Sequence, residues 1–371
     1  MKIFTLTTQY ANNYGALLQC YALCDFLNSI EGVECKVIRY LPDGYNNSWR
    51  LIPKARTFRD VLKNIYLIFR LDLLIKRMRK QRVMKEFIKR FIPVTQEIYN
   101  RRNILSNPPV GDAFVCGSDQ IWNFKYRIDL TYFFDFVDRT KSKIISYAPS
   151  IADPWTDEQC QFIKPYLGRF DAISIREAGN LSQVNELVPN MNPVVVIDPV
   201  FLICPEKWKT IASHKLCPKE PYILCYFLSV SQLGVKTVEH IRNLTGYKVL
   251  HLNLNALDKF HSDYDIRLAS PLDFIGLIEN ASFVCTNSFH CSAFSIIFKR
   301  NFMFVPKNMA NERVESLINK FKINDVIIRE KDLTKIQLSD LNVDYSKSES
   351  YLNEFLTFSK DYINKAIFDG N

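Results

Sequence analysis

Short apolar runs and helical repeats alternate along most of the chain. Residues 3–8 form a β-prone run, and the apolar positions from Ala16 to Leu27 then recur at helical spacing. A second β-prone run at 35–39 completes a predicted strand–loop–helix–strand unit. The alternation returns from residue 112, with predicted strands at 113–116, 143–147, 172–177 and 194–197. This rhythm predicts an α/β fold.

A second series of elements begins after Pro205. The pattern predicts strands at 222–227, 248–252, 281–285 and 302–305, and helices at 233–244, 271–279, 311–321 and 348–367. The chain has 371 residues, 47% of them hydrophobic, which is enough for two packed cores. We therefore predict two α/β domains, residues 1–205 and 206–345, followed by a C-terminal helix in 346–371.

Polar residues follow several predicted strands. Asn12 and Asn13 follow the first strand, and Ser118, Gln120 and Asn123 follow the strand at 113–116. If the strands are parallel, these side chains gather at the sheet edge where such folds bind ligands. The two asparagines either shape their turn or contact a ligand. Their loop lacks the G-x-G-x-x-G pattern of a dinucleotide site, which disfavours a nicotinamide or flavin enzyme.

Arg176 stands directly after the apolar part of the strand at 172–177. An arginine in this position can bind an anion through two parallel hydrogen bonds. The alternative is a structural salt bridge to Glu177 or Asp198. The sequence alone leaves both interpretations open.

Residues 284–294 place a strand, a polar corner and a helix around His290. Thr286, Asn287 and Ser288 are residue types that cap helices, so the free N–H groups of the next helix should open beside the histidine. Such a corner suits a phosphate or a carboxylate. Histidine is suited to acid–base chemistry near neutral pH, although a lone histidine after a strand is more often structural.

One basic segment accounts for the net charge of +9. The stretch 50–102 has 16 Lys or Arg and 4 Asp or Glu, a local excess of +12, and its pattern is helical. The segment is either a solvated helical insertion or a surface for an anionic membrane, with an apolar stripe edged by basic residues. Nucleic acid is a weaker alternative, because no recognised binding motif accompanies the charge. The residues that edge the stripe are Arg70, Lys76, Arg77, Arg79 and Lys80.

Other features bound the class of protein. The start of the chain has too short an apolar run for a secretory signal, and no stretch approaches the roughly 18 apolar residues of a spanning helix, so we expect a cytoplasmic protein. The ten cysteines are scattered, which predicts structural thiols rather than disulfides or zinc ligands. The triplet 263–265 resembles a metal-binding D-x-D, a pattern that often arises by chance.

Four motifs together resemble the polysaccharide pyruvyl transferase family, over residues 1 to about 325. The basic insertion and the C-terminal tail are not part of the resemblance. The motifs are Gly117-Ser118-Asp119-Gln120-Ile121-Trp122-Asn123, Ser174-Ile175-Arg176-Glu177, Ile197-Asp198-Pro199-Val200 and Thr286-Asn287-Ser288-Phe289-His290.

The resemblance implies a glycosyltransferase type B-like fold, with two doubly wound Rossmann-like domains facing a cleft. It implies that phosphoenolpyruvate donates its enolpyruvyl group to two hydroxyls of a sugar in a polysaccharide repeat unit, as in capsule or exopolysaccharide, and forms a pyruvate ketal. No redox cofactor or metal is required. We expect a lipid-linked acceptor, an enzyme peripheral at the inner face of a bacterial membrane, and no nucleic-acid partner.

The resemblance also implies roles for individual residues. His290 would be the catalytic acid/base, and Arg176 would bind the carboxylate or phosphate of the donor. Residues 206–345 would form the donor side, with Asn287, Ser288, Phe289 and Arg313 near the donor, and residues 1–205 the acceptor side. Many family members carry arginine where this chain has Ser288, so helix N–H groups, Lys307 or Arg313 would replace that cation. The candidate acceptor-binding residues are Asn12, Asn13, Ser118, Gln120 and Asn123.

Two other functions fit the same sequence. One is a nucleotide-sugar-dependent glycosyltransferase of the same architecture, which a nucleoside diphosphate sugar would stabilise where phosphoenolpyruvate would not. The other is a non-catalytic, membrane-docked assembly factor for polysaccharide synthesis, which would bind anionic vesicles without turning over either donor.

Overall fold

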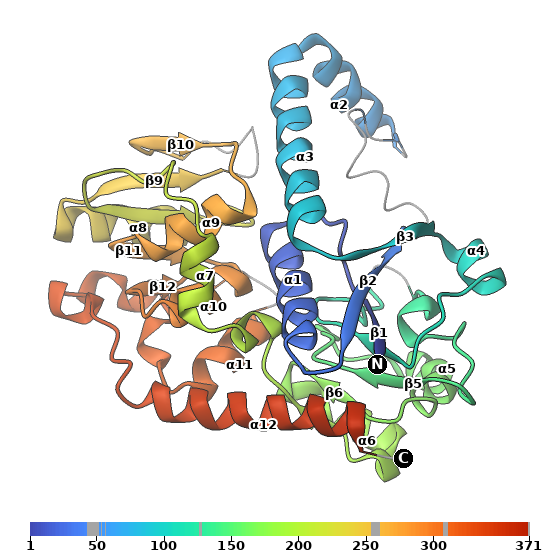
Figure 1. Ribbon diagram of the computed structural model, residues 1–371. Helices are drawn as coiled ribbons and strands as arrows, with labels where there is room; N and C mark the ends of the chain where they lie inside the picture. Colours follow the sequence, from blue (N-terminus) through green and yellow to red (C-terminus); the bar gives the residue numbers. More distant parts are fainter. Residues whose placement is uncertain are drawn as a thin grey trace. The chain divides into compact units, whose positions relative to one another are not determined.

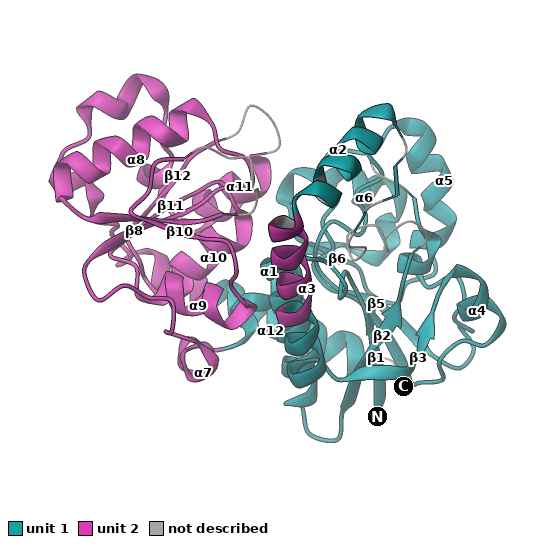
Figure 2. Ribbon diagram, turned by 90° about the horizontal axis from the view of Figure 1, so that it is seen from above, with its two compact units in different colours: residues 1–70, 84–203, 354–371 teal, residues 71–83, 204–353 magenta. Residues whose placement is uncertain are grey.

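The computed structural model describes residues 1–42, 52, 54–55, 57–125, 128–253, 260–306 and 311–369. These residues form two compact units (Figure 2). Unit 1 comprises residues 1–70, 84–203 and 354–371, and unit 2 comprises residues 71–83 and 204–353. The main division along the chain therefore falls between Ile203 and Cys204, and the last part of the chain returns to unit 1.

Unit 1 is built on a five-stranded parallel sheet in the order β3-β2-β1-β4-β5 (Figure 1). The central strands are buried along almost their whole length, since helices cover both faces of a parallel sheet. The strands are β1 (Lys2–Leu6), β2 (Glu34–Tyr40), β3 (Val94–Tyr99), β4 (Ala113–Cys116) and β5 (Lys143–Ser146).

Helices and one small sheet complete unit 1. The parallel pair β6 (Ser174–Ile175) and β7 (Val194–Val195) forms a separate sheet, joined to β5 by a single bridge between Ile145 and Ala172. The helices that lie wholly or partly in this unit are α1 (Tyr14–Asn28), α2 (Phe58–Phe69), α3 (Leu71–Phe91), α4 (Arg101–Ser106), α5 (Asp157–Leu167), α6 (Leu181–Leu187) and α12 (Ser348–Phe368).

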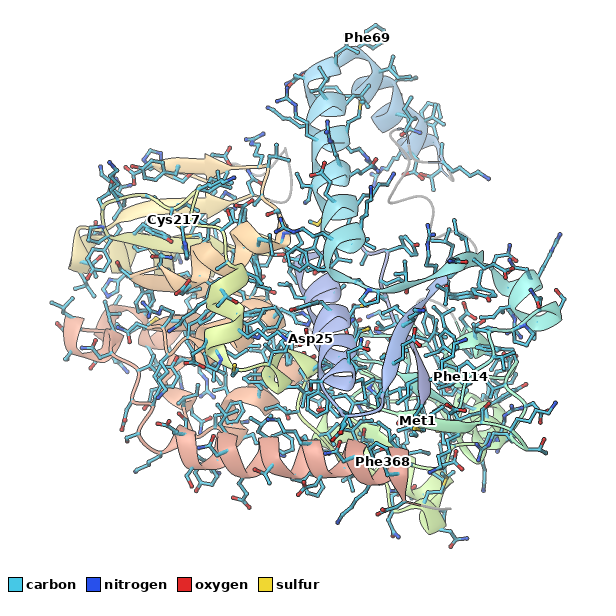
Figure 3. All side chains as sticks on the ribbon, viewed as in Figure 1. Met1, Asp25, Phe69, Phe114, Cys217 and Phe368 are labelled. Atoms are coloured by element: carbon cyan, nitrogen blue, oxygen red, sulfur yellow. The ribbon has the colours of Figure 1, made fainter. Side chains whose placement is uncertain are left out.

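Aromatic side chains fill much of the core of unit 1. Trp122 stacks on Phe133 with ring centroids 5.0 Å apart, and the indole N–H of Trp155 donates to the Trp122 carbonyl at 2.9 Å. Phe114 of β4, labelled in Figure 3, belongs to the same buried cluster. The loop 117–125 therefore begins at a polar sheet edge and ends in a rigid apolar core.

Helix α12 is held on unit 1 by specific contacts. The backbone N–H of Ile197 donates to Ser359 Oγ at 2.9 Å, and Tyr362 Oη donates to the Ser146 carbonyl at 2.9 Å. Lys143 Nζ donates to the carbonyl of Ile367 at 2.9 Å, at the C-terminal end of the helix, where a cation is favoured. The predicted C-terminal helix thus packs next to β5 and the Ile197 segment.

Unit 2 repeats the design of unit 1. Its five-stranded parallel sheet has the order β10-β9-β8-β11-β12 (Figure 1). The strands are β8 (Tyr222–Tyr226), β9 (Lys248–Leu252), β10 (Tyr264–Ile266), β11 (Phe283–Thr286) and β12 (Phe302–Phe304). The helices that lie wholly in this unit are α7 (Pro205–Ile211), α8 (Gln232–Thr245), α9 (Pro271–Glu279), α10 (Phe289–Ile297) and α11 (Glu312–Lys320).

Both sheets therefore have the doubly wound topology, and the predicted fold class is confirmed. In such a sheet the strand order reverses next to the first strand, and ligands bind beyond the carboxyl ends of the strands at that point. The reversal lies between β1 and β4 in unit 1 and between β8 and β11 in unit 2. These two edges carry the motifs at 117–123 and 286–290.

Candidate functional site

The corner before α10 is tied to the neighbouring strand at the reversal point of unit 2. Asn287 Oδ1 accepts from the backbone N–H of Leu228 at 2.7 Å, and its Nδ2 donates to the Ser229 carbonyl at 2.8 Å. Thr286 Oγ1 donates to the Tyr226 carbonyl at 2.7 Å. The amide of Asn287 therefore fixes the loop after β8 to the end of β11, in the position where a doubly wound sheet binds ligands.

His290 lies in the first turn of α10, directly after this corner. The helix begins at Phe289 and its N-cap is Ser288, whose Oγ accepts from the backbone N–H of Cys291 at 3.5 Å. The imidazole is half-buried and meets the Phe289 ring edge to face, with centroids 5.2 Å apart. His290 is thus presented by a rigid helix terminus whose N–H groups favour negative charge.

The predicted donor-binding residues fall into two groups in this unit. Asn287, Ser288 and Phe289 are contiguous with His290, and all three are buried. Arg313 lies half-buried in the first turn of α11, and α11 packs against α10. Lys307 lies outside the described residues. The donor-binding roles of these residues stay predictions.

A second histidine, not predicted as a site residue, is buried on the same sheet. His251 pairs in register with Cys225 across β9 and β8, and its ring lies 4.7 Å from that of Phe260. Asn253, two residues later, donates to Asp265 Oδ1 at 3.0 Å. His251 had only one signal in the sequence: it is a polar residue at a core position of an apolar strand.

The carboxylates of the D-x-D triplet are both engaged. Asp263 accepts from the backbone N–H of Val249 at 2.8 Å and lies 3.4 Å from the side-chain nitrogens of Arg242 and Lys248. Asp265 pairs with Arg267 at 2.6 Å. Burial alone would raise the pKa of Asp265, but hydrogen bonds from Arg267 and Asn253 outweigh burial and lower it. Among the described residues, no cluster of His, Cys, Asp and Glu could hold a metal ion.

In unit 1, Arg176 is the centre of a buried ion-pair network. Its Nε donates to Glu177 Oε1 at 3.0 Å, and its Nη1 donates to Asp198 Oδ2 at 2.8 Å. Ser118 Oγ donates to the same Asp198 oxygen at 2.9 Å and lies 3.3 Å from Nη1 of Arg176. The network therefore joins the ends of β4, β6 and β7. The salt-bridge interpretation of Arg176 is what the structure shows, with both expected partners.

The positive charge of Arg176 is outnumbered by the negative charges of the nearby carboxylates. Burial alone would lower the pKa of the Arg176 guanidinium, but the carboxylates of Glu177, Asp198 and Asp119 raise it above its ordinary value. One buried cation therefore faces three acidic side chains. An incoming anion would have to compete with these carboxylates, so the donor-binding role of Arg176 stays a prediction.

The reversal point of unit 1 is held by polar contacts between the ends of β1 and β4. Thr7 Oγ1 donates to the Ser118 carbonyl at 2.6 Å, and Thr8 Oγ1 donates to Asp119 Oδ2 at 2.6 Å. Asp119 has a φ of +76°, and Ala148, at the end of β5, has a φ of +55°. Both values lie in the left-handed region that L-residues rarely adopt, and such strain clusters at functional sites.

The predicted acceptor-binding residues surround this edge, with different local partners. Asn123 Nδ2 donates to Gln120 Oε1 at 2.9 Å, so the two amides orient each other. Asn13 is the N-cap of α1, and its Oδ1 accepts from the backbone N–H of Gly15 at 2.9 Å. Asn12 is half-buried, and Ser118 is fully buried in the Arg176 network. Their acceptor-binding roles stay predictions.

Several solved structures are similar to this chain over most of its length. A Listeria monocytogenes protein assigned as a UDP-N-acetylglucosamine 2-epimerase aligns over 100% of this chain and 91% of its own, with 12% identity and a TM-score of 0.50. S. aureus MnaA in complex with UDP aligns over 98% of this chain and 97% of its own, with 13% identity and a TM-score of 0.49. The spinosyn forosaminyltransferase SpnP aligns over 99% of this chain and 94% of its own, with 10% identity and a TM-score of 0.42. No curated protein matches the chain.

The topology of the two sheets and the likeness to the Listeria protein define a glycosyltransferase type B-like α/β protein. Within that class, the sequence profile of polysaccharide pyruvyl transferases matches residues 13–306, which include the corner around His290 and the Arg176 network. The chain belongs to the polysaccharide pyruvyl transferase family, as its motifs predicted.

Proposed function

We propose that this protein transfers the enolpyruvyl group of phosphoenolpyruvate to two hydroxyls of one sugar in a lipid-linked polysaccharide repeat unit. The product is a cyclic pyruvate ketal, and phosphate is released. Membership of the pyruvyl transferase family supports the reaction class. The observation that carries the assignment of residues is the position of His290 in the first turn of α10, at the reversal point of a doubly wound sheet.

The chemistry requires a proton on the methylene carbon, the loss of a proton from each hydroxyl, two new carbon–oxygen bonds and the breaking of the bond to phosphate. A proton adds to the methylene carbon of the donor, and the first sugar hydroxyl attacks the adjacent carbon and loses its own proton. The second hydroxyl then displaces phosphate from the same carbon, and its proton leaves with the phosphate. The balance closes because the proton of the first hydroxyl replaces the one added to the methylene carbon, and the proton of the second is carried by the released hydrogen phosphate. An acid/base group at the methylene carbon and stabilisation of the departing phosphate are the two demands on the protein.

His290 is suited to the first demand. The side chain is half-buried, so it is held by its surroundings and still meets the surface. Thr286, Asn287 and Ser288, in the corner before it, are fixed by hydrogen bonds to β8, to the loop after β8 and within the corner, which limits movement of the start of α10. A preorganised imidazole can both give and take a proton in one catalytic cycle.

The helix terminus is suited to the second demand. The N-terminus of α10 carries a partial positive charge, which favours a phosphate or carboxylate. Arg313 would add a full charge from α11. In the proposal, Arg176 binds the donor's carboxylate or phosphate, and Asn12, Asn13, Ser118, Gln120 and Asn123 hydrogen-bond the acceptor.

The test is phosphate release from phosphoenolpyruvate in the presence of galactosyl, glucosyl and mannosyl acceptors with a lipid-like tail. We compare the wild type with His290→Ala and with His261→Ala, an exposed histidine of the same unit. The proposal is supported if phosphate release needs an acceptor, is retained in His261→Ala and is lost in His290→Ala. Turnover by His290→Ala near the wild-type rate would overturn the role of the histidine.

Donor identity is tested separately. Phosphoenolpyruvate should raise the melting temperature of the wild type, because a ligand that binds only the native state stabilises it. The proposal would be overturned in favour of a glycosyltransferase by two results together. Phosphoenolpyruvate would leave the melting temperature unchanged, and a nucleoside diphosphate sugar would both raise it and donate its sugar.

A further inference from the structure

Helices α2 and α3 expose an unusual number of large apolar side chains. Phe69 is 80% exposed and Leu71 is 66% exposed, although soluble proteins seldom leave such residues in contiguous groups on the surface. We call the set from 65 to 75 the apolar tip. Its described exposed members are Ile65, Tyr66, Ile68, Phe69, Leu71 and Ile75.

The apolar tip surrounds a sharp turn in the chain. A single residue, Arg70, separates the end of α2 from the start of α3. The Arg70 guanidinium donates to Tyr66 Oη at 3.0 Å and lies 5.8 Å from the centre of the Tyr66 ring. Figure 3 shows Phe69 at this turn, with its side chain pointing outward. The turn therefore presents apolar residues at its outermost point.

The far end of α3 is anchored in the core of unit 1. Met84, Phe87 and Ile88 are buried, and Tyr21 of α1 meets the rings of Phe87 and Phe91 edge to face. The first half of this 21-residue helix has mostly exposed side chains. One continuous helix thus has a fixed base and an exposed apolar end.

Basic residues follow the apolar tip along α3. Lys76, Arg79 and Arg82 are exposed, and the segment 58–91 has 11 Lys or Arg against 3 acidic residues. Lys80 is half-buried and burial lowers its pKa to about 8, so we do not count it among the exposed cations. At a rise of about 1.5 Å per residue, Leu71 lies roughly 8 Å along the axis from Lys76 and roughly 16 Å from Arg82.

This spacing matches the surface of an anionic bilayer. Amphipathic helices bury apolar side chains roughly 5 to 10 Å into the boundary between headgroups and acyl chains, and basic residues near that depth contact anionic headgroups. We propose that the apolar tip and the cations of α3 dock this protein on an anionic lipid bilayer. Within the described residues, no helix combines the length and hydropathy required to cross a membrane, so the proposed contact is peripheral.

The alternative occupants explain less of the surface. A nucleic acid would contact the cations but would leave Phe69 and Leu71 exposed to water. A second copy of the chain would cover the apolar tip but would bring two basic segments together, which repel each other. An anionic bilayer satisfies both the apolar and the charged residues. The proposal does not depend on the donor or on the reaction.

The first test measures co-sedimentation of the full chain with vesicles, without substrates. One set contains phosphatidylcholine alone, and the other contains roughly one part phosphatidylglycerol to two of phosphatidylcholine. We expect binding to the anionic vesicles that weakens as salt is added. Replacing Lys76, Arg79 and Arg82 with glutamine should weaken binding about tenfold or more. The matched control replaces three exposed lysines of unit 2, Lys215, Lys331 and Lys347, and should bind like the wild type.

The second test separates insertion from simple charge attraction. The double variant Phe69→Ser, Leu71→Ser should lose binding, whereas Val110→Ser, Leu338→Ser, which removes two exposed apolar residues elsewhere, should retain it. A Phe69→Trp variant should show fluorescence quenching by brominated lipids beyond that of the wild type. Val110→Trp, also 80% exposed in the wild type, should not.

Three outcomes would overturn the proposal. They are absence of binding to anionic vesicles, equal loss of binding in the basic-site variant and its lysine control, and no added quenching for Phe69→Trp. A dimer in solution that dissociates in Phe69→Ser, Leu71→Ser without any vesicle binding would assign the apolar tip to a second copy. All variants are compared with the wild type by circular dichroism, so that loss of folding is separated from loss of binding.

Discussion

Asp198 accepts a hydrogen bond of 2.8 Å from Nη1 of Arg176, and the side chains are 0% and 4% exposed. The two residues follow different strands of the small β6-β7 sheet, and Ser118 brings the end of β4 to the same oxygen. Asp198 Oδ1 also accepts from the backbone N–H of Val200 at 3.1 Å. This carboxylate therefore organises three loops at the candidate acceptor edge of unit 1.

We predict that Asp198→Ala lowers the free energy of unfolding of unit 1 by about 3 to 5 kcal/mol, because it removes one partner of a buried ion pair together with the bonds that Arg176 and Ser118 donate to it. Urea unfolding followed by far-UV circular dichroism measures the change. Glu330→Ala is the control, since Glu330 pairs with Lys236 on the surface and should unfold like the wild type. Equal midpoints for the wild type and Asp198→Ala would contradict the prediction.

A second prediction concerns the corner that carries His290. Asn287→Ala removes the bonds to the backbone N–H of Leu228 and the carbonyl of Ser229, both near a buried strand end. Unsatisfied buried groups of this kind cost about 1 to 3 kcal/mol, so we expect a destabilisation of about 2 kcal/mol. Phosphate release should fall as well, because the residue that positions the start of α10 is lost.

Unfolding in urea and phosphate release are measured on the same preparations of Asn287→Ala. The control is Asn342→Ala, an exposed asparagine whose amide contacts Asn301 at 3.2 Å. Asn342→Ala should change neither the free energy of unfolding nor the rate of phosphate release. A folded Asn287→Ala protein with the wild-type rate would show that the corner does not position the catalytic group.

The sequence predicted the doubly wound architecture because both sheets have strongly apolar central strands. Two edge strands were missed. β3 (Val94–Tyr99) has a mostly exposed, mixed pattern, and β10 (Tyr264–Ile266) has only three residues, half-buried or exposed. The predicted strand at 172–177 is reduced to the two residues of β6. Edge strands carry weak hydrophobic signals because only part of their surface is buried.

The candidate site was predicted less completely than the fold. The capping role of Ser288 follows from residue type, but His290 lies within the helix, where the sequence interpretation had a polar turn. The partners of Arg176 include Ser118, 58 residues away. Such a contact depends on which strands are neighbours, and a single sequence does not contain that information. His251 belonged to no motif, and Asp119, although it lies within the motif at 117–123, was given no role of its own.

The thiols offer a direct check of the packing. Cys204 is exposed, Cys160 and Cys217 are half-buried, and the other seven cysteines are buried. We predict that iodoacetamide modifies Cys204 first in the native protein, as mass spectrometry of timed samples would show, because buried thiols are both inaccessible and hard to ionise. Cys204→Ser should lose this fast phase. Early modification of Cys285 or Cys291 would show that the corner around His290 is open.

The buried thiol of Cys291 also predicts a dependence of stability on pH. Burial raises the pKa of Cys291 to about 12, whereas a thiol in the unfolded chain titrates near about 8.5. The native state therefore keeps a proton that the unfolded state loses between these values. The stabilisation is fully present below about pH 8.5 and declines as the pH rises toward 12, by about 1.4 kcal/mol per pH unit for one such group.

The Cys291→Ala variant isolates this contribution. Other buried groups, including Cys285 and Tyr222, also have pKa values raised by burial, so the wild type should lose stability above pH 9 for several reasons at once. Removing the Cys291 thiol lowers the free energy of unfolding at every pH, because packing is lost. It should also reduce the slope of the free energy of unfolding against pH between pH 8 and 10.5, by up to the contribution of one proton, about 1.4 kcal/mol per pH unit. Urea unfolding at three pH values measures both effects. Parallel curves for the wild type and the variant would mean that Cys291 ionises as readily in the folded protein as in the unfolded chain, and that the first turn of α10 admits water.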